Sequence, residues 1–364
     1  MRDRIDAILR GDAATLPTGA AGDALLAQAR AHRVHLLIAW CTRQGPTDLE
    51  RLGGGWRSLA EEMRVEALTD ARREVEVARV VAALEAAGAA PVVFKGAALA
   101  RSHYPEPWLR PRLDTDLLIA PDRREAAFGA LRALGYERPP FVSGEHVMHQ
   151  APFVRSDGGV EHVLDVHWRI ANVEVVARVL GHADVHGRSR QVLLHGHPVR
   201  VPSPADALLL ALLHRVAHHA DSEERLWLYD VHLLSEALDA AGWAHVVGTA
   251  RAHAVTAMCA RGLELARGAF RTAVPAEVIG ALASRAGEEP SAVYLRPHLR
   301  PVDRLLAEWR ALGPRAGLAL LREHLLPPPQ YIVSRYGVRW RALLPLLYAR
   351  RVVVGAGKWF VTPR

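Results

Sequence analysis

The stretch LDTDLLI, residues 113–119, follows shortly after PVVFKG, residues 91–96, and these two segments decide the fold that we expect. Successive side chains of a β-strand point to opposite faces, so Asp114 and Asp116 share one face of a strand over 113–119. Two carboxylates this close repel each other and shift each other's pKa. A hard cation such as Mg²⁺ removes the conflict, because it prefers oxygen ligands. The segment therefore predicts a metal site, and the alternative is a strand-start cap beside a solvated acid.

The segment before this strand has the pattern of a phosphate-binding turn. PVVFKGAALARSHY, residues 91–104, predicts a short strand that ends near Lys95, a turn at Gly96 and then a helix. A helix N-terminus offers unpaired N–H groups and a positive dipole end, which suit phosphate. Glycine allows a close backbone approach. Lys95 is one of two lysines in an arginine-rich chain, the other being Lys358. We expect Lys95 to contact phosphate; otherwise it is an accident of composition.

A third carboxylate is expected from the strand pattern of VEHVLDVHWRI, residues 160–170. Its alternation places Asp165 and His167 on one face. The turn signal SDGG precedes it, and APFVR is a plausible partner strand. A strand with one acid beside a strand with two is how a two-metal phosphoryl-transfer site is assembled. Asp165 could instead pair with Arg169. His167 could orient a carboxylate or shuttle a proton, although a satisfied, partly buried histidine is the more common case.

Two further groups of polar residues are candidates for the site. Arg110 and Arg112 flank Pro111 just before the acids, and either could bind a triphosphate through a bidentate fork or be an ordinary surface arginine. A second polar cluster follows later in the chain, where two histidines stand four residues apart on one predicted helix face. A polar network between helices, lining the acceptor side of a cleft, is favoured over an independent metal site there. The cluster consists of His214, His218, His219, Asp221, Asp230 and His232.

Length and charge bound the class of protein. The 364 residues allow two or three domains, and a net charge of +7 favours anionic partners. No sequence motif typical of nucleic-acid binding is present, so we expect no specific nucleic-acid partner. No apolar run is long enough to span a membrane, and the N-terminus lacks the apolar core of a signal peptide. Cys41 and Cys259 suggest buried free thiols, and we expect a cytoplasmic protein.

The chain divides into four expected regions. Residues 1–88 have helical spacing, 89–202 contain most strand signals, 203–326 return to helical spacing, and 327–364 form a basic tail that begins with three prolines. Residues 331–364 contain seven arginines or lysines and no acid. The tail is expected to pack across the catalytic region; the alternative is contact with an anionic membrane surface or acidic partner. The expected strands cover 91–95, 113–119, 146–154 and 160–168, with a short strand near 195–204, and a helix covers 122–134.

An ordered set of segments resembles the uncharacterised bacterial nucleotidyltransferase family of the polymerase-β superfamily. These segments are VVFKGAALARSHYPEP (92–107), LRPRLDTDLLI (109–119), LDVHWRI (164–170) and ALLLALLHRVAHHADSEERLWLYDVHLL (207–234). The resemblance covers roughly residues 20–260. It implies an α+β fold in which a small mixed sheet with flanking helices lies between N-terminal and C-terminal helical regions.

The same resemblance implies roles for individual residues. Asp114, Asp116 and Asp165 would be the metal carboxylates, and the Lys95-Gly96-Ala97 turn would hold the triphosphate. This chain departs from the pattern twice. Many relatives have Gly-Ser at the phosphate turn, whereas Ala97 supplies no hydroxyl here, and Asp165 stands where the family often has the longer Glu.

The expected activity is that of a metal-dependent nucleotidyltransferase. Two Mg²⁺ (or Mn²⁺) ions and an NTP such as ATP would be used to modify an unidentified hydroxyl or phosphate of a small-molecule or peptide acceptor. One alternative is a glycosyltransferase whose Asp114-Thr115-Asp116 binds a nucleotide-sugar, but such folds place an α/β half before this motif, and residues 1–88 look helical. The other alternative is a non-catalytic nucleotide-binding or antitoxin-like module.

Overall fold

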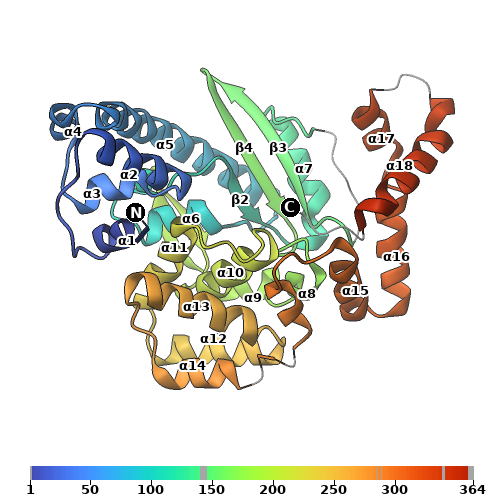
Figure 1. Ribbon diagram of the computed structural model, residues 1–364. Helices are drawn as coiled ribbons and strands as arrows, with labels where there is room; N and C mark the ends of the chain where they lie inside the picture. The colour runs from blue at the N-terminus through green and yellow to red at the C-terminus, as the bar shows by residue number, and fades with distance from the viewer. Residues whose placement is uncertain (1, 140–145, 285, 288, 338–340, 360–364) are drawn as a thin grey trace.

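A computed structural model of the chain describes residues 2–139, 146–284, 286–287, 289–337 and 341–359. At its centre lies a four-stranded mixed sheet of order β1-β2-β4-β3, with N-terminal helices on one side and C-terminal helices on the other (Figure 1). β2 pairs with β1 in antiparallel and with β4 in parallel orientation, and β3 pairs with β4 as an antiparallel hairpin. The strands are β1 (Val92–Phe94), β2 (Thr115–Leu118), β3 (Gln150–Asp157) and β4 (Val160–His167).

Helices account for most of the remaining chain, as the α+β prediction requires. The N-terminal helices are α1 (Arg2–Leu9), α2 (Gly19–Ala31), α3 (His35–Cys41), α4 (Pro46–Leu52) and α5 (Gly55–Ala86). Those within and beside the sheet region are α6 (Lys95–Ser102), α7 (Arg124–Ala133), α8 (Glu174–Ala177) and α9 (His182–Gly187). The next group is α10 (Pro204–Ala217), α11 (Arg225–Glu236), α12 (Ala240–Ala252), α13 (Thr256–Phe270) and α14 (Ala276–Ala283). The last group is α15 (Pro301–Leu312), α16 (Pro314–Leu325), α17 (Pro329–Tyr336) and α18 (Leu344–Trp359). Short 3₁₀ turns occupy Pro107–Leu109, Pro121–Arg123, Pro290–Leu295 and Arg341–Leu343.

The two faces of the sheet pack into different cores, because alternate strand residues point to opposite sides. Val92 and Leu118 contribute to the larger core, which is built largely from the helices α1–α3 and α10–α14. Val93 and Leu117 contribute to a smaller core under α5 and α7. Asp116 lies two residues before Leu118 in β2 and therefore faces the same side as Leu118, toward the large helical core.

The structure differs from the sequence prediction at two strands. β3 begins at Gln150 rather than near 146, and a hairpin of β5 (Arg190–Leu194) and β6 (His197–Val201) replaces the single short strand expected near 195–204. Its turn places His195 and Gly196 at positive φ, 46° and 77°. A residue other than glycine is uncommon at positive φ. Only one of the two turn residues is a glycine, so the sequence predicted this hairpin only weakly. α10 begins at Pro204, directly after Ser203, whose Oγ accepts a hydrogen bond from Asp206 N at 3.2 Å and so caps the helix.

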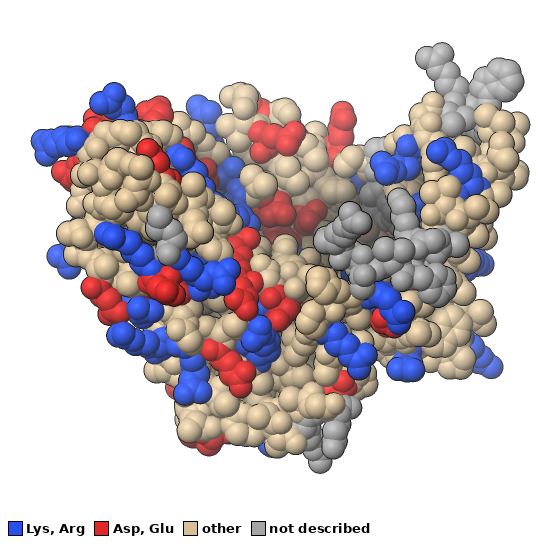
Figure 2. All heavy atoms as spheres, viewed as in Figure 1, with Lys and Arg blue, Asp and Glu red and all other residues tan. Residues whose placement is uncertain are grey.

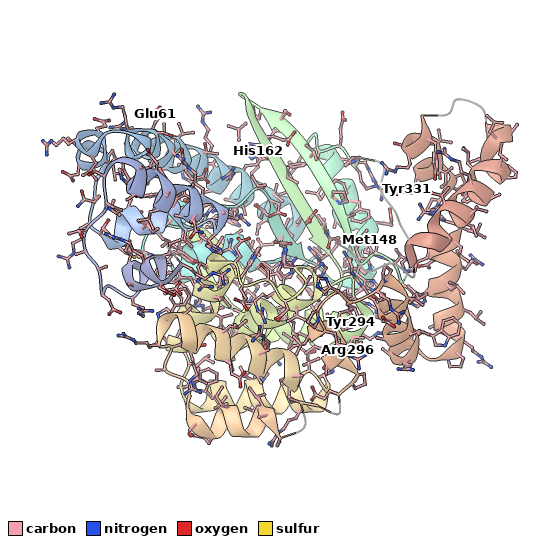
Figure 3. The ribbon with its side chains drawn as sticks, in the orientation of Figure 1. Glu61, Met148, His162, Tyr294, Arg296 and Tyr331 are labelled. Carbon is pink, nitrogen blue, oxygen red and sulfur yellow. The ribbon has the colours of Figure 1, made fainter. Side chains whose placement is uncertain are left out.

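Within the described residues, no helix has both the length and the apolarity needed to cross a membrane. The C-terminal helices are held to the sheet region by a side-chain cap. Glu323 of α16 accepts hydrogen bonds from the backbone N–H groups of His146 and Val147 at 2.9 and 3.0 Å. Figure 3 shows the neighbouring Met148 at the end of β3 that lies nearest to these helices.

Candidate metal and nucleotide site

Two carboxylates are brought together by the parallel pairing of β2 and β4. In this register Asp116 lies opposite Asp165, and Leu118 lies opposite His167. Residues paired in adjacent strands point to the same face, so Asp116, Asp165 and His167 all project toward one point. One ligand atom from each lies within 4.8 Å of the others. The predicted side-by-side position of the two acid-bearing strands is therefore confirmed.

The side chain of Lys95 contacts this group of acids. Its backbone has a φ of 51°, which is sterically unfavourable for a residue with a Cβ and is typical of functional turns. The conformation directs the side chain across the edge of β2, where Lys95 Nζ donates to Asp116 Oδ1 at 2.6 Å and lies 3.4 Å from His167 Nε2. A primary ammonium thus stands where a metal cation would be expected.

The charges around Asp116 explain its ionisation. Burial alone raises the pKa of Asp116, but the Lys95 ammonium and the hydrogen bond with His167 Nε2 at 2.9 Å outweigh it and hold the pKa well below its usual range. Burial, followed by the positive charge of Lys95, lowers the pKa of His167 to about 4. A neutral imidazole beside an ionised carboxylate can donate one hydrogen bond and fix the carboxylate's orientation. His167 was considered as an orienting residue from sequence, and the structure places it in direct contact with Asp116.

Asp165 has the opposite electrostatic environment. Burial and then the charges of Asp116 and Asp114 raise the pKa of Asp165 to about 6, even though Gln150 Nε2 donates to its Oδ2 at 2.8 Å. Asn172 Nδ2 in turn donates to Gln150 Oε1 at 3.0 Å. Neither Gln150 nor Asn172 was identified from the sequence. Gln150 is brought to Asp165 only by the pairing of β3 with β4.

Asp114 lies at the exposed rim, just before β2 begins. It is outside the group of three ligand atoms that lie within 4.8 Å of each other. Loss of hydration and the neighbouring charge of Asp116 raise the pKa of Asp114. Asp114 stands two residues before Asp116, so we describe the three acids together as the acidic recess. Figure 2 shows acidic side chains gathered in such a recess near the middle of the visible face.

Gly96 is required by a close contact within the protein. A Cβ at this position would lie 2.5 Å from Arg110 Nη1. Arg110 is 3% exposed and donates from Nε and Nη2 to the two carboxylate oxygens of Asp230 in α11, at 3.0 and 2.7 Å. Tyr104 Oη donates to the same Asp230 at 2.7 Å. The turn after β1 is thereby tied to the helical region that faces the acids.

The other residues of the predicted phosphate site are also largely buried. Arg112 is 8% exposed and lies 2.5 Å from Asp70 Oδ1 of α5. Ala97 packs into the smaller core, so only its backbone can serve a ligand. In this structure Arg110 and Arg112 are engaged in ion pairs, and contact of either with a triphosphate stays a prediction.

The later histidine cluster forms a neutral wall next to Lys95. The rings of His214 and His218 stack at 4.9 Å, and His219 Nε2 lies 3.0 Å from His214 Nε2. Burial, followed by the charge of Lys95, lowers the pKa of all three histidines. A small pocket between α6, α10 and α11 is lined by Lys95, Arg110, His214, Trp227 and Asp230, among others. Within the described residues, the one group of three or more metal-ligating side chains is Asp116, Asp165 and His167, so the histidine cluster is best described as a polar network.

A small mixed sheet with flanking helices, two carboxylates on adjacent parallel strands and a lysine at the preceding turn are together typical of the nucleotidyltransferase class. The chain belongs to the uncharacterised nucleotidyltransferase family, whose model matches residues 19–271. The matched region runs from α2 through α13 and contains the whole sheet and the acidic recess. Helices α14–α18 lie beyond it. A search of curated proteins finds no match.

Proposed function

We propose that this protein transfers a nucleotidyl group from an NTP to a hydroxyl or phosphate acceptor, with divalent metal ions held by Asp114, Asp116 and Asp165. The main supporting observation is the parallel register of Asp116 with Asp165, together with Lys95 Nζ 2.6 Å from Asp116 Oδ1. This donor set fits the metal, because its carboxylate oxygens suit Mg²⁺ or Mn²⁺ and an ammonium already neutralises one of them. When bound, the metal ions neutralise the triphosphate, acidify the acceptor and stabilise the leaving group.

Asp116 and Asp165 have different roles in the proposed reaction. Asp116 is fully ionised and oriented by His167, as a metal ligand needs to be. Asp165, which lies opposite Asp116 on the parallel strand, is the carboxylate that we assign to take the proton of the acceptor. In the reaction the acceptor oxygen bonds to the α-phosphorus, its proton passes to Asp165, and the bond from the α-phosphorus to the bridging oxygen breaks to release pyrophosphate.

Lys95 changes partner in this scheme. Without nucleotide it pairs with Asp116; with nucleotide and metal bound, Lys95 would contact the triphosphate, and Asp116 would be free to hold the metal. Both positions lie within reach of one flexible side chain at the start of α6. The N–H groups of the first turn of α6 supply further donors for phosphate oxygens.

The glycosyltransferase alternative is not favoured by the arrangement. It would separate the Lys95-Gly96 turn from the acids and would need an α/β nucleotide-binding half before β1, where this chain has the helices α1–α5.

The test is incubation of the protein with each labelled NTP and Mg²⁺, followed by detection of released pyrophosphate and of label on the protein or an added acceptor. We expect turnover or self-labelling with at least one NTP and none with Asp116→Asn. UDP-glucose serves as the donor that only a glycosyltransferase would use. Equal pyrophosphate release by the wild type and Asp116→Asn, or binding of no NTP at all, would overturn the proposal.

A further inference from the structure

A large cleft lies between the sheet region and the C-terminal helices, and most of its lining residues lie beyond the residues that match the family. Its volume is about 740 Å³. α15 and α16 form one wall, α17 and α18 form another, and Val147 and Asn172 close the side toward the sheet. The backbone at Val147 is fixed by its hydrogen bond to Glu323 of α16, so the wall is a built part of the fold. Figure 1 shows the C-terminal helices standing beside the β3 edge of the sheet.

The lining of this cleft combines apolar walls with unbalanced positive charge. Its apolar side chains include Val147, Leu305, Leu321, Leu325 and Val352. Three arginines and one acid also line it. Arg304 pairs with that acid, Glu308, at 3.1 Å. Among the described residues no carboxylate pairs with Arg335 or Arg351. Such a lining suits a molecule with an apolar body and an anionic group.

The cleft is connected to the candidate catalytic acids by one chain of hydrogen bonds. Asn172 lines the cleft and reaches Asp165 through Gln150, by hydrogen bonds of 3.0 and 2.8 Å. A ligand that contacts Asn172 in the cleft is therefore two hydrogen bonds away from the third carboxylate.

The strand order of the sheet indicates from which side an acceptor in the cleft would approach the acids. Lys95 follows β1 at one edge of the sheet, Asp116 and Asp165 lie on the two central strands, and Gln150 lies on β3 at the other edge. Phosphoryl transfer requires the attacking and leaving oxygens to be roughly in line across the phosphorus. A triphosphate on the Lys95 side leaves the β3 side open to the attacking group.

We propose that the cleft between α15–α18 and the sheet binds the acceptor, an amphipathic anion whose reactive oxygen points toward Asp165. Its role as an acceptor site rests on the proposed nucleotidyl transfer; its preference for an apolar anion stands on the lining alone. Helices α15–α18, which supply most of this lining, lie beyond the residues that match the family.

The test uses 8-anilinonaphthalene-1-sulfonate, a fluorescent apolar anion, and its uncharged relative N-phenyl-1-naphthylamine. The full-length wild type should bind the sulfonate saturably. Arg335→Glu/Arg351→Glu should weaken this binding by about tenfold or more, since each charged contact contributes substantially to affinity, and should leave binding of the neutral probe nearly unchanged. Leu305→Trp, which fills the cleft, should weaken both probes. The matched control is Arg310→Glu/Arg315→Glu, which makes the same charge change at exposed positions of α15 and α16 outside the lining.

Calorimetry with a non-hydrolysable ATP analogue and Mg²⁺ separates this proposal from the previous one. The Arg335/Arg351 double variant should keep wild-type nucleotide affinity, and Asp116→Asn should lose nucleotide but keep the sulfonate. Saturating sulfonate should leave the nucleotide affinity of the wild type unchanged, because donor and acceptor bind together. Equal sulfonate affinity in the cleft variant and its matched control would overturn the cleft as an anion site, and competition between the two ligands would overturn it as an acceptor site. Nucleotide binding that survives Asp116→Asn would instead refute the proposed transfer while leaving the anion site intact.

Discussion

Replacement of Lys95 by methionine should have opposite effects on the affinity for a metal ion and on the affinity for a nucleotide. The ammonium lies 2.6 Å from Asp116 Oδ1 in a largely buried position, so a metal ion that binds without nucleotide must first displace it. A hydrogen bond between charged groups contributes about 1.5–3 kcal/mol, which corresponds to roughly 10- to 150-fold in affinity. Lys95→Met should therefore bind Mn²⁺ more tightly by up to this factor and bind an NTP analogue more weakly by a similar factor.

The assay is calorimetric titration at pH 8, where the carboxylates are ionised, first with Mn²⁺ alone and then with a non-hydrolysable NTP at saturating Mn²⁺. Arg101→Met is the matched control, because Arg101 lies on the same helix, pairs with Glu74 and does not contact the acids. It should change neither affinity. If Lys95→Met binds Mn²⁺ no more tightly than the wild type, Lys95 does not compete with a metal for Asp116, and the exchange of partners drawn above is wrong.

Three further outcomes are expected. Asp114→Asn and Asp116→Asn should each lower pyrophosphate release by about hundredfold or more, since each removes ligand charge without changing shape, and near-normal release would exclude that residue as a ligand. Gly96→Ala should lower the free energy of unfolding by roughly 1–3 kcal/mol, because its Cβ would lie 2.5 Å from Arg110 Nη1; an unchanged urea midpoint would contradict this contact. Asp165→Asn should stabilise the metal-free protein by roughly 1–3 kcal/mol at pH 8 and by much less near pH 4. The pKa of Asp165 is raised to about 6 from 3.8, so the folded state loses stability as pH rises between these values. If the stability gained by Asp165→Asn in urea unfolding does not depend on pH, the pKa of Asp165 is not raised.

The parts of the site that follow from local pattern could be predicted from the sequence. The two-residue period of 113–119 and 160–168 defines which side chains share a face, and this period does not depend on the rest of the chain. Asp116 and Asp165 accordingly emerge on one side of adjacent strands. Ser203 was predictable as a helix cap for the same reason, since its partner is the N–H of Asp206, three residues away.

The parts that depend on distant partners could not be predicted in this way. Arg110 is buried by Asp230, which is 120 residues later in the chain, and no local pattern encodes that pairing. Gly96 was expected to allow a close approach of phosphate. In the structure its missing side chain makes room for Arg110 within the protein. The cleft beside Asn172 likewise depends on how α15–α18 dock against the sheet, which a basic and apolar tail sequence does not specify.

If the protein transfers a nucleotidyl group as proposed, the position of Lys95 would couple metal binding to nucleotide binding. Without ligands, the ammonium reduces the mutual repulsion of Asp114, Asp116 and Asp165, and this keeps the recess stable without a metal. A metal ion alone would leave Lys95 facing a second cation with no anion to accept it. A triphosphate provides that anion, so it lowers the cost of metal entry, and by thermodynamic reciprocity the metal strengthens nucleotide binding by the same factor. In the proposed scheme the metal ion would therefore enter the acidic recess together with the nucleotide rather than before it.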